Sequence, residues 1–252
     1  MTFAIPKQIR PWLDQGLNFF YPALCQICRT NRAGADESFI CASCVSGKEG
    51  VHFLVPPYCE RCCFPFEGDI SNKFECSNCC ETELHFRYAR SAVVTSPLLL
   101  HVIHRWKYNR ALWFEPFLAE LLIREAAPAL REEKWDLIVP VPLHTRKERE
   151  REFNQAERLA KHLSEATKIP MNGNLLNRVE FTLTQTQLTR EQRAENVRRA
   201  FTMKAGKKLN GEKIILLDDV LTTGATTSAC AKVLREAGAS EVCVWTVARA
   251  RG

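Results

Sequence analysis

Residues 214–226 read IILLDDVLTTGAT, and this stretch decides both the fold and the candidate site. Its first four residues, Ile214–Leu217, form an apolar run that is typical of a strand buried on both faces. Two carboxylates follow at Asp218 and Asp219, and a short loop of threonine and glycine then opens a helical pattern. We expect the strand to end at the two carboxylates, which places them at the tip of a sheet.

The loop after the carboxylates has the composition of a phosphate-binding turn. Backbone N–H groups, threonine hydroxyls and a helix N-terminus all attract a phosphate, and Gly224 lets the backbone approach it closely. The two carboxylates would repel a phosphate unless they met hydroxyl groups or a metal ion, and a sugar diol beside the phosphate supplies those hydroxyls. The alternative is an ordinary helix N-terminus with incidental acidic residues.

We therefore predict that Asp218 and Asp219 bind the O2 and O3 hydroxyls of a ribose, with Mg2+ nearby. The phosphate would be held by the residues of the loop and of the following turn. These residues are Thr222, Thr223, Gly224, Ala225, Thr226 and Thr227. The chain contains no P-loop pattern, so nothing in it supports an ATPase.

Around this stretch, residues 89–252 alternate strand and helix patterns. Apolar runs predict strands at 89–94, 136–139, 213–217 and 241–248. Apolar residues at helical spacing predict helices over 99–106, 114–122, 156–166 and 225–237. Continuous apolar strands separated by helices are typical of an α/β fold whose parallel sheet is covered on both faces. Ligands of such sheets bind at the carboxyl ends of the strands.

The first third of the chain is rich in cysteine, since ten of the 12 cysteines lie between Cys25 and Cys80. Four Cys-x-x-Cys pairs follow in order, separated by 12 residues in the first half and by 13 in the second, so one unit is used twice. Two such turns complete a tetrahedral site of four thiolates, and we predict two structural zinc ions. The ligands would be Cys25, Cys28, Cys41 and Cys44, and Cys59, Cys62, Cys76 and Cys79.

Other uses of these cysteines stay open at this point. Disulfides need an oxidising compartment, and an iron–sulfur cluster also takes four cysteines. Cys63 and Cys80 directly follow ligand candidates and could replace them, and a cross-braced pairing of the four turns is also possible. Four cysteine ligands leave no open metal position, which favours a structural role over a catalytic one.

Composition suggests two domains, 1–88 as a double zinc ribbon and 89–252 as the α/β unit. Net charge is +6, but residues 1–85 hold 7 basic against 10 acidic residues, so the later part should attract anions. A hydrophobic content of 46% excludes disorder for most of the chain. Neither a membrane-spanning run nor a secretory signal is recognisable, and we expect a cytoplasmic protein that is not inserted in a membrane.

The stretch 214–226 resembles the phosphoribosyl pyrophosphate (PRPP) signature of type I phosphoribosyltransferases. VPLHTRKEREREFNQAERLA at 141–160, QTQLTREQRAENVRRAF at 185–201 and WKY at 106–108 resemble the ComF/GntX group. That group joins a zinc ribbon to a phosphoribosyltransferase domain. The resemblance implies the type I phosphoribosyltransferase fold, PRPP binding, and a role in DNA uptake (competence) or in the use of external DNA. One departure is Glu152, where the group usually has glycine.

The middle of the chain adds candidate ligands for pyrophosphate. The strand at 136–139 runs into a loop that reaches Pro142 at the same sheet edge, and the basic residues Arg146, Lys147, Arg149 and Arg151 follow. We select Pro142 and Arg146, because Arg146 is nearest to the loop. A charge run of alternating sign is also typical of a solvated helix face. Lys107 could point at the same pyrophosphate or be a surface lysine.

The polar segment 185–196 suggests a mobile lid that closes over the site and excludes water. Its Arg190 and Arg193 would then reach the departing pyrophosphate and count, with Asp218 and Asp219, as catalytic residues. The alternative is an ordinary surface loop.

Three functions fit these features. The first is an enzyme that transfers phosphoribosyl from PRPP to a nitrogen nucleophile and releases pyrophosphate. Such a transfer needs cations and N–H donors around the leaving group more than a protein nucleophile. The second is a non-catalytic factor that handles single-stranded DNA. The third is a PRPP sensor that docks a protein partner, such as a component of the competence machinery, through the ribbons.

Overall fold

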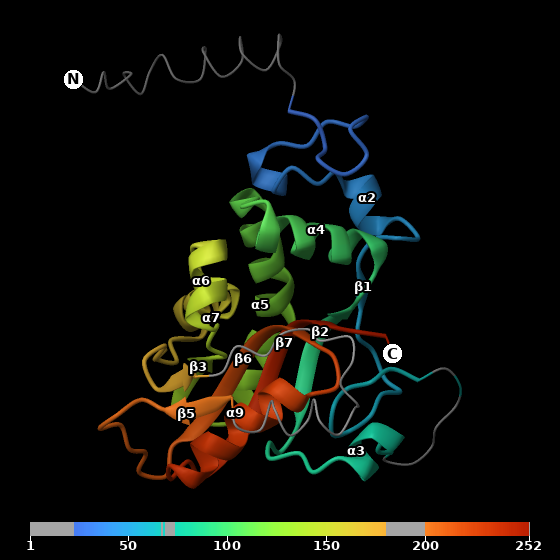
Figure 1. Ribbon diagram of the computed structural model, residues 1–252. Helices are drawn as coiled ribbons and strands as arrows, with labels where there is room; N and C mark the ends of the chain where they lie inside the picture. Colours follow the sequence, from blue (N-terminus) through green and yellow to red (C-terminus); the bar gives the residue numbers. More distant parts are fainter. Residues whose placement is uncertain (1–22, 67, 69–73, 180–199, 252) are drawn as a thin grey trace, which may run out of the picture.

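The computed structural model describes residues 23–66, 68, 74–179 and 200–251 (Figure 1). A five-stranded sheet in the order β1-β2-β7-β6-β3 lies at its centre. β2, β7, β6 and β3 are parallel, as predicted, while β1 pairs antiparallel with β2 at one edge. The strands are β1 (His52–Phe53), β2 (Ala89–Val94), β3 (Leu137–Pro140), β6 (Lys213–Leu221) and β7 (Glu241–Arg249).

Helices cover both faces of the sheet, which explains the continuous apolar strands. On one face lie α4 (Pro97–Tyr108), α5 (Glu115–Glu132) and α7 (Gln155–Thr167), and on the other lies α9 (Ala225–Glu236). Ile215 and Leu217 of β6 pack in the cluster of the first face, and Ile214 and Leu216 in that of the second. The α/β arrangement predicted from the sequence is therefore confirmed.

The remaining described elements are short. α6 (Thr145–Arg151) follows β3, and β4 (Leu176–Arg178) pairs antiparallel with β5 (Phe201–Met203) in a second small sheet that the sequence patterns did not predict. The cysteine-rich part contains α2 (Ala42–Ser46), α3 (Ser77–Glu81) and the 3-10 turn Ala35–Glu37, and a further 3-10 turn at Leu112–Phe114 precedes α5. None of the helices in the described ranges is long and apolar enough to span a membrane.

Strand β6 is longer than predicted. We expected it to end at Leu217, but it continues to Leu221, because Asp218, Val220 and Leu221 remain paired with the equally long β7. On the other side, β3 ends at Pro140 opposite Leu217. β6 therefore extends past β3, and the two carboxylates lie within the strand rather than after it.

The two halves of the cysteine-rich part pack on opposite faces of the sheet. Ile40 and Phe53 belong to the cluster formed with α4, α5 and α7, whereas Leu84 and Phe86 belong to the cluster formed with α9. β1, which lies between the halves, joins the central sheet. The cysteine-rich part therefore packs against both faces of the α/β unit. The domain boundary after residue 88 stays a prediction.

Glu152 ends α6 in the left-handed backbone region, with φ of 66° and ψ of −4°. Its backbone N–H donates to the carbonyl of Glu148, and its side chain forms an ion pair with Arg110 at 2.6 Å. The left-handed region costs a residue with a Cβ atom about 1–2 kcal/mol. Glycine avoids this cost, which gives a physical reason for the glycine that the ComF/GntX group usually has here.

Replacing this residue by glycine (Glu152→Gly) should raise the free energy of unfolding by about 0.5–1 kcal/mol, since the strain disappears while the lost ion pair is exposed and weak. Urea denaturation measures the change. The control is Glu152→Gln, which removes the charge but keeps Cβ, and which should give no gain. Equal destabilisation in both variants would show that the ion pair outweighs the strain.

Candidate functional site

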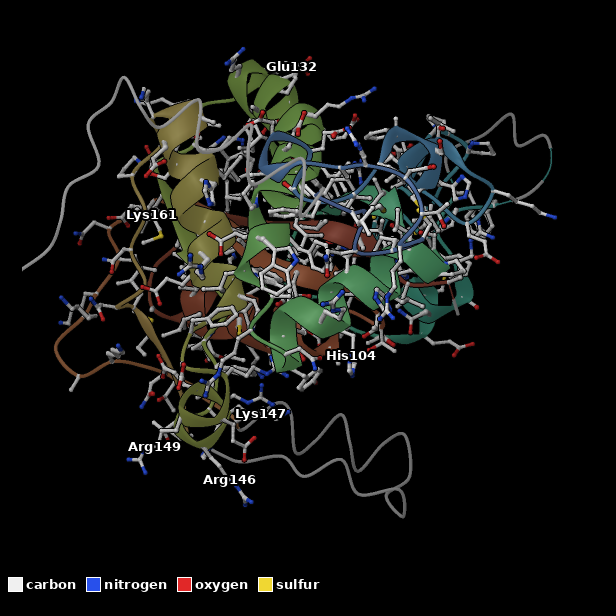
Figure 2. All side chains as sticks on the ribbon, turned by 90° about the horizontal axis from the view of Figure 1, so that it is seen from above. His104, Glu132, Arg146, Lys147, Arg149 and Lys161 are labelled. Carbon is white, nitrogen blue, oxygen red and sulfur yellow. The ribbon has the colours of Figure 1, made fainter. Side chains whose placement is uncertain are left out.

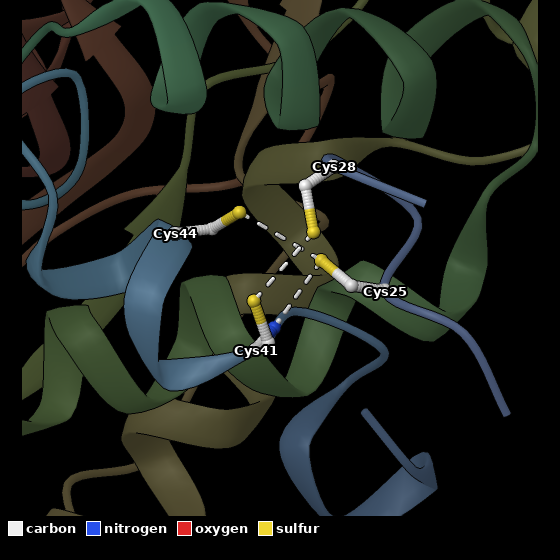
Figure 3. Close-up of side chains that lie close together, drawn as sticks. All are labelled: Cys25, Cys28, Cys41 and Cys44. Carbon is white, nitrogen blue, oxygen red and sulfur yellow. Dashed lines mark hydrogen bonds between the residues drawn. The ribbon is translucent and has the colours of Figure 1, made fainter. Parts of the chain in front are cut away.

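The first four-cysteine group joins two turns of the chain. The sulfur atoms of Cys25, Cys28, Cys41 and Cys44 all lie within 4.8 Å of one another, at 3.9 Å for the Cys25–Cys44 and Cys28–Cys41 pairs (Figure 3). The backbone N–H groups of Ile27 and Cys41 donate to the Cys25 sulfur. Hydrogen bonding from the Asn31 backbone, followed by that from Thr30, lowers the pKa of Cys28 to about 6.

The second group repeats this arrangement with Cys59, Cys62, Cys76 and Cys79, all four buried. Sulfur–sulfur distances are 3.8 Å for Cys59–Cys79 and 3.5 Å for Cys62–Cys76. Cys63 instead donates to the hydroxyl of Ser91, and the exposed Cys80 donates to the carbonyl of Glu75. Each group therefore uses the predicted ligands from its own half, and neither a cross-braced pairing nor a replacement by Cys63 or Cys80 is found.

Both groups fit zinc by distance and by donor type. Zn–S bonds of about 2.3 Å place tetrahedral sulfur ligands about 3.8 Å apart, which matches the observed separations. All 12 cysteines lie in the described part of the chain, and all are free thiols rather than disulfides. The two groups could hold zinc ions, and four thiolates per ion fit a structural role.

The threonine loop has the backbone geometry of a helix N-terminus without a side-chain cap. Gly224 is the N-cap of α9, with φ of 83°, a left-handed value that favours glycine. Thr222 and Thr223 are exposed, whereas Thr227 is buried and donates its hydroxyl to the Gly224 carbonyl at 3.0 Å. Gly224 has no side chain to cap α9, and the Ala225 N–H donates to the Thr223 hydroxyl at 3.4 Å, so this helix N-terminus suits an anion.

Asp218 and Asp219 point to opposite faces of the sheet, because successive strand side chains alternate. Asp219 is buried and forms an ion pair with Lys107 at the end of α4. Burial, and next the charge of Asp219, raise the pKa of Asp218 to about 7, against the opposing charges of Lys107 and Arg178. Lys107 is therefore drawn to the carboxylates rather than lying free on the surface.

Cations from three elements lie near one another and near the carboxylates, and we call them the cation group: Lys107 of α4, Lys147 and Arg151 of α6, and Arg178 of β4. Burial, followed by the charges of Arg178, Arg151 and Lys107, lowers the pKa of the half-buried Lys147. Burial likewise lowers the pKa of Arg178 in β4, although the Cys230 thiol and Asp218 oppose this shift. Arg151 donates to the hydroxyl of Tyr108 and to Gln155. Like charges held close together suit a polyanionic ligand such as pyrophosphate.

The basic residues of α6 divide between two sides of the helix. Figure 2 shows Arg146 and Arg149 directed outward, and the Arg146 side chain is 66% exposed and pairs with Glu150. Lys147 and Arg151 instead belong to the cation group. Arg146, predicted because it is nearest to the loop, stays a prediction, although Lys147 and not Arg146 lies near Lys107 and Arg178. Arg178 was not among the predicted residues, because β4 was not predicted. A helix of seven residues directs only some of its side chains to any one side.

For three of the predicted site residues, the described part of the chain shows no side chain or N–H group that could donate to a ligand. Pro142 lies in the loop after β3, but it has no N–H, so it can shape this loop without donating to a ligand. Arg190 and Arg193, with the expected lid at 185–196, lie outside the described residues. The assignments of Asp218, Asp219 and the threonine loop stay predictions, because no bound ligand tests them.

No family model matches the chain. Competence protein F of Haemophilus influenzae is 31% identical over 222 residues, which cover 82% of this chain and 96% of that protein. The DNA utilization protein YhgH of Salmonella typhi is 30% identical over 231 residues, or 90% of this chain and 97% of that protein. The structure of glutamine PRPP amidotransferase from B. subtilis matches 52% of this chain but only 25% of its own, with 26% identity and a TM-score of 0.34.

The raised pKa of Asp218 predicts a pH-dependent gain in the variant Asp218→Asn. The folded protein holds a proton on Asp218 up to a pKa of about 7, whereas the unfolded chain releases it near the ordinary 3.8, so stability falls as pH rises between these values. Asparagine should therefore raise the free energy of unfolding by about 1–3 kcal/mol at pH 8 and by much less at pH 5. Thermal or urea unfolding at both pH values measures this difference.

The matched control for this prediction is Asp219→Asn, which breaks the ion pair with Lys107 and should give no gain at pH 8. An Asp218→Asn variant whose advantage is the same at pH 5 and pH 8 would show that Asp218 is ionised throughout.

Proposed function

The chain belongs to the ComF family, and from that premise we propose that it binds PRPP with Mg2+ and transfers its phosphoribosyl group to a nitrogen nucleophile. The α/β fold, with a parallel sheet covered on both faces, suits this class of enzyme. The threonine loop would take the 5′-phosphate, Asp218 and Asp219 the ribose hydroxyls, and the cation group the pyrophosphate.

One observation carries this proposal: the two carboxylates, the threonine loop and the cation group lie together at one edge of the sheet. β6 supplies both carboxylates and leads into the threonine loop, while Lys107, Lys147 and Arg178 arrive from three other elements. A carboxylate pair alone would attract cations, and a cation group alone would attract any anion. Side by side, they suit a ligand that carries a diol between two phosphate groups.

The proposed reaction is a substitution at C1 of the ribose. The C1–O bond to pyrophosphate breaks and its electron pair leaves with pyrophosphate, while the lone pair of the nitrogen acceptor forms the new C1–N bond. Bound Mg2+ would neutralise part of the pyrophosphate charge. Lys147 and Arg178 would stabilise the charge that develops on the leaving oxygen, and Asp218 and Asp219 would hold the ring in place through its hydroxyls. Arg190 and Arg193 are proposed as further donors.

Zinc in the two four-cysteine groups is proposed as a structural metal. Free thiols in metal-ligand geometry suit a reducing compartment, which favours action in the cytoplasm. The names of competence protein F and of the DNA utilization proteins support a role linked to DNA uptake or to the use of external DNA.

A second candidate is the handling of single-stranded DNA without turnover. It is favoured by Tyr108, which is 60% exposed and whose ring lies 4.9 Å from that of His104. The guanidinium of Arg151 lies 4.7 Å from the same ring. An exposed aromatic ring beside cations can stack on a base and attract its phosphates.

The variant Asp218→Asn/Asp219→Asn should weaken PRPP binding about 100-fold or more, because two charge-assisted contacts to the ribose are lost. Isothermal titration calorimetry with PRPP and Mg2+ measures the dissociation constant. The control is Glu236→Gln, which removes an exposed carboxylate that pairs with Lys232 and should leave binding unchanged. Unchanged affinity in the double variant would refute the site, and binding of a single-stranded oligonucleotide without PRPP binding would support the second candidate.

The two neighbouring cations of α6 should differ in their effect on pyrophosphate binding. Lys147→Ala should raise the dissociation constant of Mg-pyrophosphate about tenfold, because it removes a charge from the cation group. Arg146→Ala should raise it less than about twofold, since that side chain is exposed to solvent screening. Calorimetry on the two variants measures this contrast, and a larger effect of Arg146 would reverse the assignment.

A further inference from the structure

Arg249, the last residue of β7, is a buried cation that has no part in the proposed chemistry. It is 3% exposed and lies between the second four-cysteine group and the end of β6. Its Nε donates to the Cys62 carbonyl at 3.0 Å, and its Nη2 lies 3.6 Å from the Cys62 sulfur. Its Nη1 donates to the carbonyls of Leu221 and Ala250, at 3.0 and 2.9 Å.

The charge of Arg249 needs a counter-charge, because an isolated buried ion is costly. Its hydrogen-bond acceptors in the described chain are three carbonyl oxygens and the Cys62 sulfur, and none of them is a carboxylate. The sulfur is thus the one acceptor that can be ionised. A divalent ion with four thiolates carries a net charge of −2, so a loaded second group would supply the anion that Arg249 faces.

Arg249 also contacts the strand that leads into the candidate site. Leu221 directly precedes the threonine loop, and its carbonyl accepts from both Arg249 and the Ala250 N–H. A second link runs in parallel, since Asn78 donates to the Thr223 carbonyl at 3.1 Å. Asn78 lies in α3 between the ligands Cys76 and Cys79, so the same metal would hold both links.

The same half of the cysteine-rich part also supports the first turn of α9. Ser228 accepts from the His85 N–H and donates to the Glu83 carbonyl, and Phe86 packs beneath Gly224. The first four-cysteine group lies on the opposite face of the sheet, with α4 and α5. The arginine that reaches it, Arg105, donates to the Gln26 carbonyl and stacks on Trp113 and Phe114, away from the threonine loop.

We propose that Arg249 is a positioning residue that couples metal binding in the second four-cysteine group to the conformation of the threonine loop, and that the first group has no such coupling. Its consequence for ligand affinity rests on the proposed function, because it assumes that this loop binds the phosphate of PRPP. The coupling is reciprocal by thermodynamic linkage, so a phosphate ligand in the loop also tightens metal binding in the second group.

Hydrogen exchange of the peptide 222–228, measured by mass spectrometry on the zinc-loaded full-length protein, reports on the loop without any ligand. Cys79→Ser, which opens the second group, should speed exchange of these amides about tenfold or more. Cys44→Ser, the matched change in the first group, should leave their exchange unchanged. Equal effects of the two variants, or no effect of Cys79→Ser, would overturn the proposal.

The arginine itself is tested by Arg249→Met, which keeps the length of the side chain but removes its charge and donors. Exchange at 222–228 should rise about tenfold or more, and adding Cys79→Ser should bring less than its own full effect, because the metal acts in part through Arg249 and in part through Asn78. Arg105→Met is the control and should behave as the original protein. Additive effects of Arg249→Met and Cys79→Ser would contradict the coupling.

Arg249→Lys covers the case in which Arg249→Met does not fold. Lysine keeps the charge but not the fork of donors, so exchange at 222–228 should fall between the original protein and Cys79→Ser, with two zinc ions per chain retained. Exchange equal to that of the original protein would show that the guanidinium donors of Arg249 are not needed, which contradicts the proposal.

PRPP titration separates the two proposals. If the original protein binds PRPP, Arg249→Met should bind about tenfold more weakly, and PRPP should slow zinc loss to a chromophoric chelator. If the original protein does not bind PRPP, the proposed function fails, while the exchange data still decide on the coupling.

Discussion

The pairing of β6 with β7 beyond Leu217 is the constraint on which the candidate site depends. Because that pairing continues to Leu221, Asp218 and Asp219 are held in extended backbone and point to opposite faces of the sheet. Because β3 ends at Pro140, the other side of β6 is left without a strand at the same level. The carboxylates are thus fixed at the carboxyl edge of the sheet, where sheets of this kind bind their ligands.

The charged groups near β6 then decide what chemistry this edge of the sheet can support. The two carboxylates lie in different environments, since Asp219 is buried and paired with Lys107, whereas the partly buried Asp218 has its pKa raised to about 7. The cations of α4, α6 and β4 come from distant parts of the sequence and meet only in the folded chain. Holding like charges together costs stability, which is typical of sites built to receive an oppositely charged ligand.

The sequence was sufficient where local patterns decide the structure. The apolar runs predicted the parallel sheet, and the repeated Cys-x-x-Cys spacing predicted both four-cysteine groups with their partners. It was insufficient where contacts with a distant part of the chain decide the length of a strand or the neighbours of a side chain. The length of β6 follows from the length of β7, and the position of Lys147 near Lys107 and Arg178 follows from the side of α6 on which it lies. Arg249 ends an apolar strand and shows its role only beside Cys62.

A crystal structure of the full chain with PRPP and Mg2+ tests the central claim most directly. The account predicts the 5′-phosphate on the N–H groups at the start of α9, the ribose hydroxyls within hydrogen-bond distance of Asp218 and Asp219, and the pyrophosphate among Lys107, Lys147 and Arg178. PRPP bound elsewhere, or a ribose turned away from both carboxylates, would contradict it.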